Sequence, residues 1–173
     1  ITVDSLGQGN DGQYKFRLTL NDTSASNITI ASGDWEIVLN GNNQLDGKGK
    51  SCGGIGLYIT GWGTHATIVA GTGDASLTAN GNQTSGSGDG SCGIKVEANL
   101  TVQSGNVVAV MKATGKFNDA SGAICVTGNG TLNINGGSVT AKGNGKYGLY
   151  ATGTINMSEG NFEITGENKI AVD

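Results

Sequence analysis

The sequence predicts an all-β protein built as a single-stranded parallel β-helix, a solenoid of about six coils with three short strands each. The main observation is a short sequence motif, which we call the phrase, that recurs five times. It reads apolar, any residue, apolar, a corner containing Gly, then apolar, any residue, apolar. In every copy the two apolar pieces begin seven residues apart. Such alternation turns two side chains of each short strand into a core. The copies lie at residues 28–37, 68–77, 100–109, 132–141 and 155–164.

Each coil is expected to hold three strands in a fixed order. The second and third strands are the two apolar pieces of the phrase, and the Gly before the third strand allows the positive backbone angles of a tight corner. Trp35 opens the third strand of its copy, so it is expected in the core, in line with Ala75, Val107, Val139 and Phe162 of the other copies. The first strands precede the phrase at 18–20, 57–59, 94–96, 124–126 and 149–151, with a sixth at 170–172.

The alternative to a solenoid is an antiparallel meander. A meander would require short hairpins that join longer strands, and it gives no reason to keep a three-strand order. The segments between the third strand and the next first strand vary in length and are polar and Gly-rich. In a solenoid, insertions confined to one corner stack on one flank, which is commonly the binding side.

The whole chain, residues 1–173, is predicted to form one domain, with residues 1–16 as an N-terminal cap. Only 14% of the residues are charged and the net charge is -4, which argues against nucleic acid as a partner. No apolar run is long enough to insert into a membrane. The chain begins without Met and ends in a strand, so we expect a segment of a longer protein whose open end can self-associate end to end.

Two stretches resemble the Gly-rich repeats of bacterial surface and secreted proteins: GNGTLNINGGSVTAKGNGKYGLYATGTINMSEGNFEITG at 128–166 and VAGTGDASLTANGN at 69–82. The resemblance covers most of the chain from Ile28 onward. It implies a right-handed β-helix similar to the pectate-lyase superfamily, of the carbohydrate-binding type. The matching residues are corners and core, and no catalytic motif of that superfamily is matched residue by residue.

The cysteines suggest a bridge between coils. Cys52 and Cys92 both stand in Ser-Cys-Gly just before a first strand, so they are expected to stack and form a disulfide. An extracellular setting favours this bond, because disulfides persist in oxidising surroundings. The alternative is a pair of reduced thiols at the corner. Cys125 would then be an unpaired thiol, and the three Cys and His65 show no metal-ligand spacing.

Two places are candidates for ligand binding. Outward positions of the first strands form a lengthwise column of Tyr58, Lys95, Cys125 and Tyr150, in which the rings could stack on sugar faces and Lys95 could hold a carboxylate or hydroxyl. Packing of each Tyr on its neighbouring coils is the alternative. Trp62 lies in a Gly-Trp-Gly insertion with little apolar cover, which makes it the best single candidate for sugar stacking.

A candidate metal site lies on the loop flank. Asp89, Asp119 and Asn144 each stand five residues before a first strand, so their oxygens would align if the coils stack. Ca²⁺ is the cofactor that such a column would suit, since it takes six or more oxygen ligands. Asp and Asn side chains that bond their own turns are the alternative, and nothing in the sequence requires a cofactor.

We therefore expect an extracellular carbohydrate-binding or adhesion module, secreted or on a bacterial cell surface, with a polysaccharide or glycan as its partner. One alternative is a structural spacer of a repeat-rich surface protein. The other is a polysaccharide lyase or hydrolase acting on acidic glycans. Catalysis has less support because Arg17 is remote from the Asp column and the outward Glu36 and Glu163 are several coils apart.

Overall fold

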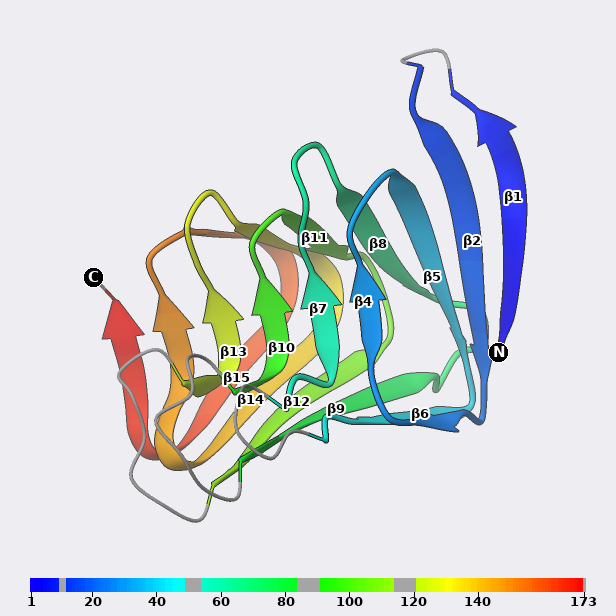
Figure 1. Ribbon diagram of the computed structural model, residues 1–173. Helices are drawn as coiled ribbons and strands as arrows, with labels where there is room; N and C mark the ends of the chain where they lie inside the picture. Colours follow the sequence, from blue (N-terminus) through cyan, green and yellow to red (C-terminus); the bar gives the residue numbers. More distant parts are fainter. Residues whose placement is uncertain (10–11, 49–53, 84–90, 114–120, 173) are drawn as a thin grey trace.

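The computed structural model describes residues 1–9, 12–48, 54–83, 91–113 and 121–172, which form one curled sheet of 15 strands without a helix (Figure 1). The sheet is mixed, because β1 (Thr2–Gln8) pairs antiparallel with β2 (Tyr14–Asn21) while the other named strand pairs are parallel. The all-β prediction is confirmed. Within these ranges, no helix has the length and apolar character that crossing a membrane would need.

The parallel strands form three ladders, and the chain visits them in turn. The first ladder contains β4 (Ile28–Ile30), β7 (Leu57–Ile59), β10 (Cys92–Val96) and β13 (Gly122–Val126). The second contains β2, β5 (Asp34–Asn40), β8 (His65–Ala70) and β11 (Asn99–Val102). The third contains β3 (Ser24–Ala25), β6 (Asn42–Asp46), β9 (Ser76–Gln83) and β12 (Asn106–Ala113).

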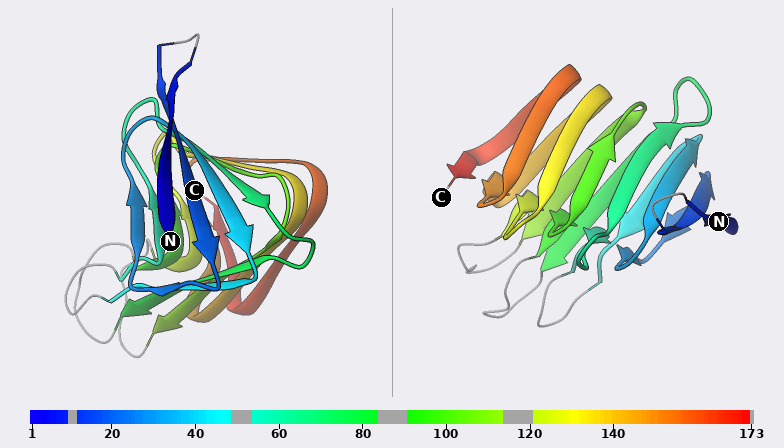
Figure 2. Two further views of the ribbon diagram at one scale, coloured as in Figure 1. Left: turned by 90° about the vertical axis from the view of Figure 1, so that its right-hand side faces the viewer. Right: turned by 90° about the horizontal axis from the view of Figure 1, so that it is seen from above.

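The last two turns depart from the expected trio of short strands. β14 (Thr131–Ala151) and β15 (Thr154–Val172) are continuous strands of 21 and 19 residues. β14 pairs with β11, then β12, then β13, so one strand bends through all three ladders, and β15 follows it. Figure 2 shows the three ladders around one interior when the molecule is seen end-on.

Apolar residues of all three ladders fill this interior. In the first ladder, Leu57, Ile94, Ile124 and Leu149 are stacked in register, and all four are buried. The copies of the phrase at 100–109, 132–141 and 155–164 also stack in the predicted register. Parallel neighbours of this kind lie about 4.8 Å apart, so each buried side chain packs on the one in the next turn.

The first two copies of the phrase stack differently from the prediction. Strand 28–30 belongs to the first ladder rather than the second, and Trp35 pairs with Ala66 in the second ladder rather than with the third-strand residues. In the next turn Leu77, not Ala75, pairs with Val107. A shift by two residues leaves the same side chains facing inward, so apolar alternation alone does not determine the register.

The N-terminal hairpin is a feature that the repeat did not predict. β1 lies along the free edge of β2, and the two strands project beyond the coils in Figure 1. The predicted cap at 1–16 thus corresponds to β1 and the start of β2. Strand 18–20 lies in β2, and Leu18 pairs with Ile37 of the second ladder. The first strand of the first turn is therefore 28–30, which explains why both strands of the earliest copy lie one ladder before their predicted place.

Candidate functional site

A groove of about 850 Å³ lies on the outer side of the second ladder, and we call it the aromatic groove. The hairpin, β5, β8 and the turn that joins β7 to β8 supply most of its lining. It is lined by Leu6, Gln13, Lys15, Phe16, Asp34, Trp35, Glu36, Trp62, Gly63, His65, Thr67, Val69 and Gln103.

Strand register sets the polar floor of this groove. Lys15, Asp34 and His65 are partners on three adjacent strands. Glu36 and Thr67 are partners one step along the same strands. Because alternate residues of a strand face the same side, these five side chains share the outer face.

A charge pair orients one of the two carboxylates in this floor. The Arg17 guanidinium lies 3.1 Å from Oε2 of Glu36, and both side chains are partly exposed. The pair therefore orders Glu36 more than it stabilises the fold, since ion pairs exposed to solvent contribute little. The groove thus presents carboxylate, amide, imidazole and ammonium groups over one polar strip.

Two aromatic elements meet this strip. The rings of Phe16 and Trp35 stack with their centroids 4.7 Å apart, and Nε1 of Trp35 donates to the carbonyl of Ser32 at 2.8 Å. Trp35 is therefore a half-buried member of the groove lining that packs against the edge of the core, and not a fully buried core residue. Trp62 is exposed to 101% of its reference area, which is rare for an indole.

The turn that carries Trp62 is fixed by its neighbours in sequence. Gly61 and Gly63 have φ angles of 87° and 74°, which favour glycine. A Cβ on Gly61 would also collide with the carbonyl oxygen of Ala31. Thr64 is fully buried and donates its backbone N–H to the carbonyl of Gly61 at 3.3 Å. The turn therefore holds the indole outward while its two ends are anchored.

The predicted column on the first ladder has the expected register. Tyr58 pairs with Lys95, Lys95 with Cys125, and Cys125 with Tyr150. Its surface is less open than expected, because Cys125 is fully buried while the other three are half-buried. The ring of Tyr150 lies 6.3 Å from that of Tyr147. Trp62 lines the groove, whereas Tyr58, Lys95 and Tyr150 do not, so the four predicted ligand-binding residues fall at two separate places.

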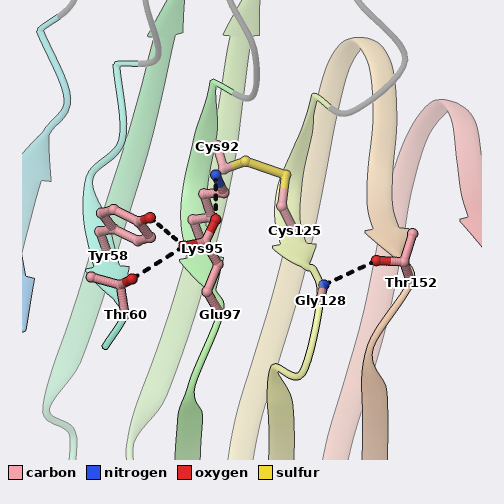
Figure 3. A network of polar contacts seen from close by, with 8 residues as sticks. All are labelled: Tyr58, Thr60, Cys92, Lys95, Glu97, Cys125, Gly128 and Thr152. Carbon is pink, nitrogen blue, oxygen red and sulfur yellow. Dashed lines mark hydrogen bonds and ion pairs between the residues drawn. A yellow bond between two sulfur atoms is a disulfide. The ribbon is translucent and has the colours of Figure 1, made fainter. Parts of the chain in front are cut away.

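Two polar groups of this column, Tyr58 and Lys95, bind the neighbouring Glu97, as Figure 3 shows. Glu97 accepts hydrogen bonds from the Tyr58 hydroxyl and, at 3.1 Å, from the Thr60 hydroxyl. Nζ of Lys95 lies 2.7 Å from Oε1 of Glu97 and 5.3 Å from the centroid of the Tyr58 ring. Tyr58 and Lys95 are thus held in a polar network with Glu97 and Thr60.

Two pKa values in this network are shifted. Burial, and then the hydrogen bond to Glu97, raise the pKa of Tyr58 above its ordinary value. Burial alone would raise the pKa of Glu97, but the hydrogen bonds from Lys95, Tyr58 and Thr60 and the charge of Lys95 outweigh it. The pKa of Glu97 therefore lies below its ordinary value, and at neutral pH the network contains a carboxylate and a neutral phenol.

The disulfide differs from the predicted one. Cys92 bonds to Cys125, with their Cα atoms 6.1 Å apart, and both residues are fully buried. The prediction of a Cys52–Cys92 bridge with a free Cys125 is therefore wrong. The shared Ser-Cys-Gly context was misleading, because β13 lies beside β10 and brings Cys125 within reach of Cys92. Cys52 lies outside the described residues.

The predicted calcium column also lies outside the described part. Asp89 and Asp119 belong to segments that are not described, and neither is the side chain of Asn144, although its backbone pairs with Lys112. Among the residues that are described, no group of three or more His, Cys, Asp or Glu side chains is suited to hold a metal ion. The calcium site stays a prediction.

Sequence reasoning found Trp62 but missed the rest of the groove. The sequence shows the alternation that turns four of the groove residues outward: Asp34, Glu36, His65 and Thr67. Which of them become neighbours depends on the strand register, and the first two copies of the phrase do not predict that register correctly. Comparison of the chain with protein-family models, with curated proteins and with solved structures found no match.

Proposed function

We propose that this protein is a carbohydrate-binding or adhesion module that holds a glycan in the aromatic groove. The observation that carries the proposal is the fully exposed indole of Trp62 at a groove that also contains Trp35 and Phe16. Apolar surface that is exposed beside a groove and rimmed by polar residues is typical of a binding site. Sugar rings offer an apolar face of C–H groups that suits such an indole.

The polar lining supports the same class of ligand. Gln13 and Gln103 supply amides, and Asp34 and Glu36 supply carboxylate oxygens. Amides can donate and accept, and carboxylates accept strongly, so together they suit the paired hydroxyls of a sugar. Stacking on one side with polar groups on the other is the usual character of a small-molecule site.

The finer fold and the location belong to this proposal. We infer that the curled sheet is a right-handed, single-stranded parallel β-helix, because three parallel ladders recur in one order around one core. We also infer a secreted or cell-surface location. The disulfide between Cys92 and Cys125 supports it, since such bonds persist in oxidising surroundings.

The test is a glycan array followed by titration calorimetry on the sugars that bind. We expect Trp62→Ala to weaken binding at least about tenfold, which is about 1.4 kcal/mol, because the stacking surface is lost. Trp62→Phe should restore part of the affinity. Tyr150→Ala, on the first ladder, is the matched aromatic control and should leave affinity unchanged.

Two results would count against the proposal. If no glycan binds, the structural spacer is the better interpretation. If binding survives Trp62→Ala but is lost in Tyr150→Ala, the site lies on the first ladder. Release of unsaturated or reducing sugar from uronic-acid polymers, measured on the same samples, tests the lyase and hydrolase alternatives.

A further inference from the structure

The outer face of the second ladder does not end at the groove. Thr67, in the floor of the groove, is the register partner of Thr101, which pairs with Asn133, which in turn pairs with Asn156. We call these four residues the amide row. Neighbouring strands are about 4.8 Å apart, so the row extends about 14 Å from the groove along the axis of the sheet.

Hydrogen bonds between strands hold this row in place. Nδ2 of Asn156 donates to Oδ1 of Asn133 at 2.9 Å, and Nδ2 of Asn133 lies 3.5 Å from the hydroxyl of Thr101. An amide has two N–H donors and an oxygen with two lone pairs. Asn133 uses one donor and one lone pair within the row, so one of each stays available to a ligand.

Beyond Thr67, the positions beside the row carry no ionisable side chain. A second row of register partners, Asn99, Thr131 and Thr154, runs beside the first on the same face. None of the outward residues from β11 to the start of β15 at these positions is ionisable, although Glu159 follows opposite Asn135 at the edge. At the groove itself, Lys15 and Arg17 are balanced by Asp34 and Glu36, so neither sign of charge is in excess. Along Thr101, Asn133 and Asn156, a polyanion would find no complementary charge.

We propose that the groove and the amide row form one extended site for an uncharged linear polysaccharide. Its chain would stack on Trp62 and then run along Thr101, Asn133 and Asn156, so that successive sugars meet successive strands. This inference rests on the proposed function, and it adds that the ligand is a neutral polymer and not a monosaccharide, a disaccharide or a uronic-acid chain. A pyranose in an extended chain is about as long as one strand spacing, so each successive sugar can lie over one successive residue of the amide row.

The experiment is calorimetric titration with neutral oligosaccharides of graded length. The probes are β-1,4-linked gluco-, xylo- and manno-oligosaccharides from disaccharide to hexasaccharide, with oligogalacturonates as the acidic series. We expect affinity for a neutral series to rise at least about tenfold with length. Asn133→Ala should abolish most of that rise while leaving the affinity for the disaccharide unchanged. Thr140→Ala, an outward position on the third ladder of the same strand, is the matched control.

The outcomes separate this inference from the proposed function. Equal affinity for disaccharide and hexasaccharide, or tighter binding of oligogalacturonates, would overturn the extended neutral site. If Trp62→Ala weakens all lengths alike while Asn133→Ala changes none, the groove stands and the row fails. If Asn133→Ala lowers the thermal midpoint, Asn156→Ala at the exposed strand β15 repeats the test with less effect on folding.

Discussion

At the residue scale, Glu97 is the centre of the polar network on the first ladder. It joins Tyr58 and Thr60 of one turn to Lys95 of the next. Glu97→Gln keeps the shape but removes the charge that pairs with Lys95. We expect the variant to lose about 1 kcal/mol of unfolding free energy at neutral pH, measured by urea denaturation. Glu163→Gln, an exposed carboxylate on β15, is the control and should change little.

The pH dependence of the stability that this network contributes follows from the directions of the pKa shifts of Glu97 and Tyr58. Because the folded pKa of Glu97 is lowered, its stabilising contribution is present above the ordinary Glu value of 4.5 and is lost as pH falls through the folded pKa. The raised pKa of Tyr58 gives the opposite dependence: its contribution is present below the ordinary Tyr value of 10.0 and is lost as pH rises through the higher folded pKa. On acidification the thermal midpoint of the wild type should fall more steeply than that of Glu97→Gln. Parallel curves would contradict this assignment.

At the element scale, the Cys92–Cys125 bond ties β10 to β13 across 33 residues of chain. In the chain-entropy model, closing a loop of this size contributes about 3–4 kcal/mol. Replacement of both cysteines by Ala should therefore lower the unfolding free energy by about that amount in urea. Both sulfurs are buried, so reductant should act on the native protein only slowly.

Peptide mapping of the oxidised protein tests the pairing itself. We expect a linked peptide that contains Cys92 and Cys125, and Cys52→Ala should leave both that peptide and the stability unchanged. A linked Cys52–Cys92 peptide would contradict the Cys92–Cys125 bond and support the pairing expected from the sequence.

At the scale of the whole molecule, the sequence predicted most where the repeat was regular. The core register of the last three copies follows from Leu100, Leu132 and Ile155 at matching positions. The register of the earlier copies was not predictable, because a two-residue shift buries the same face. The aromatic groove depended on the hairpin and on that register together. Of the groove lining, only Trp62 was singled out from sequence alone, because its Gly-Trp-Gly insertion has little apolar cover.

The same view of the whole molecule predicts association through its two ends. In the described structure β1 pairs only with β2 and β15 only with β14, so each presents a free strand edge. Val3 and Met157 expose 58% and 52% of their reference areas beside these edges. Contact of one end with the other is head-to-tail and does not close, so assembly should grow with concentration. Sedimentation velocity of the 173-residue chain should show this growth. Val3→Lys should reduce it, because a charge on an edge strand opposes pairing.

Thr78→Lys, on β9 within the third ladder, controls for added charge. A wild type that stays monomeric at all concentrations would rule out end-to-end assembly.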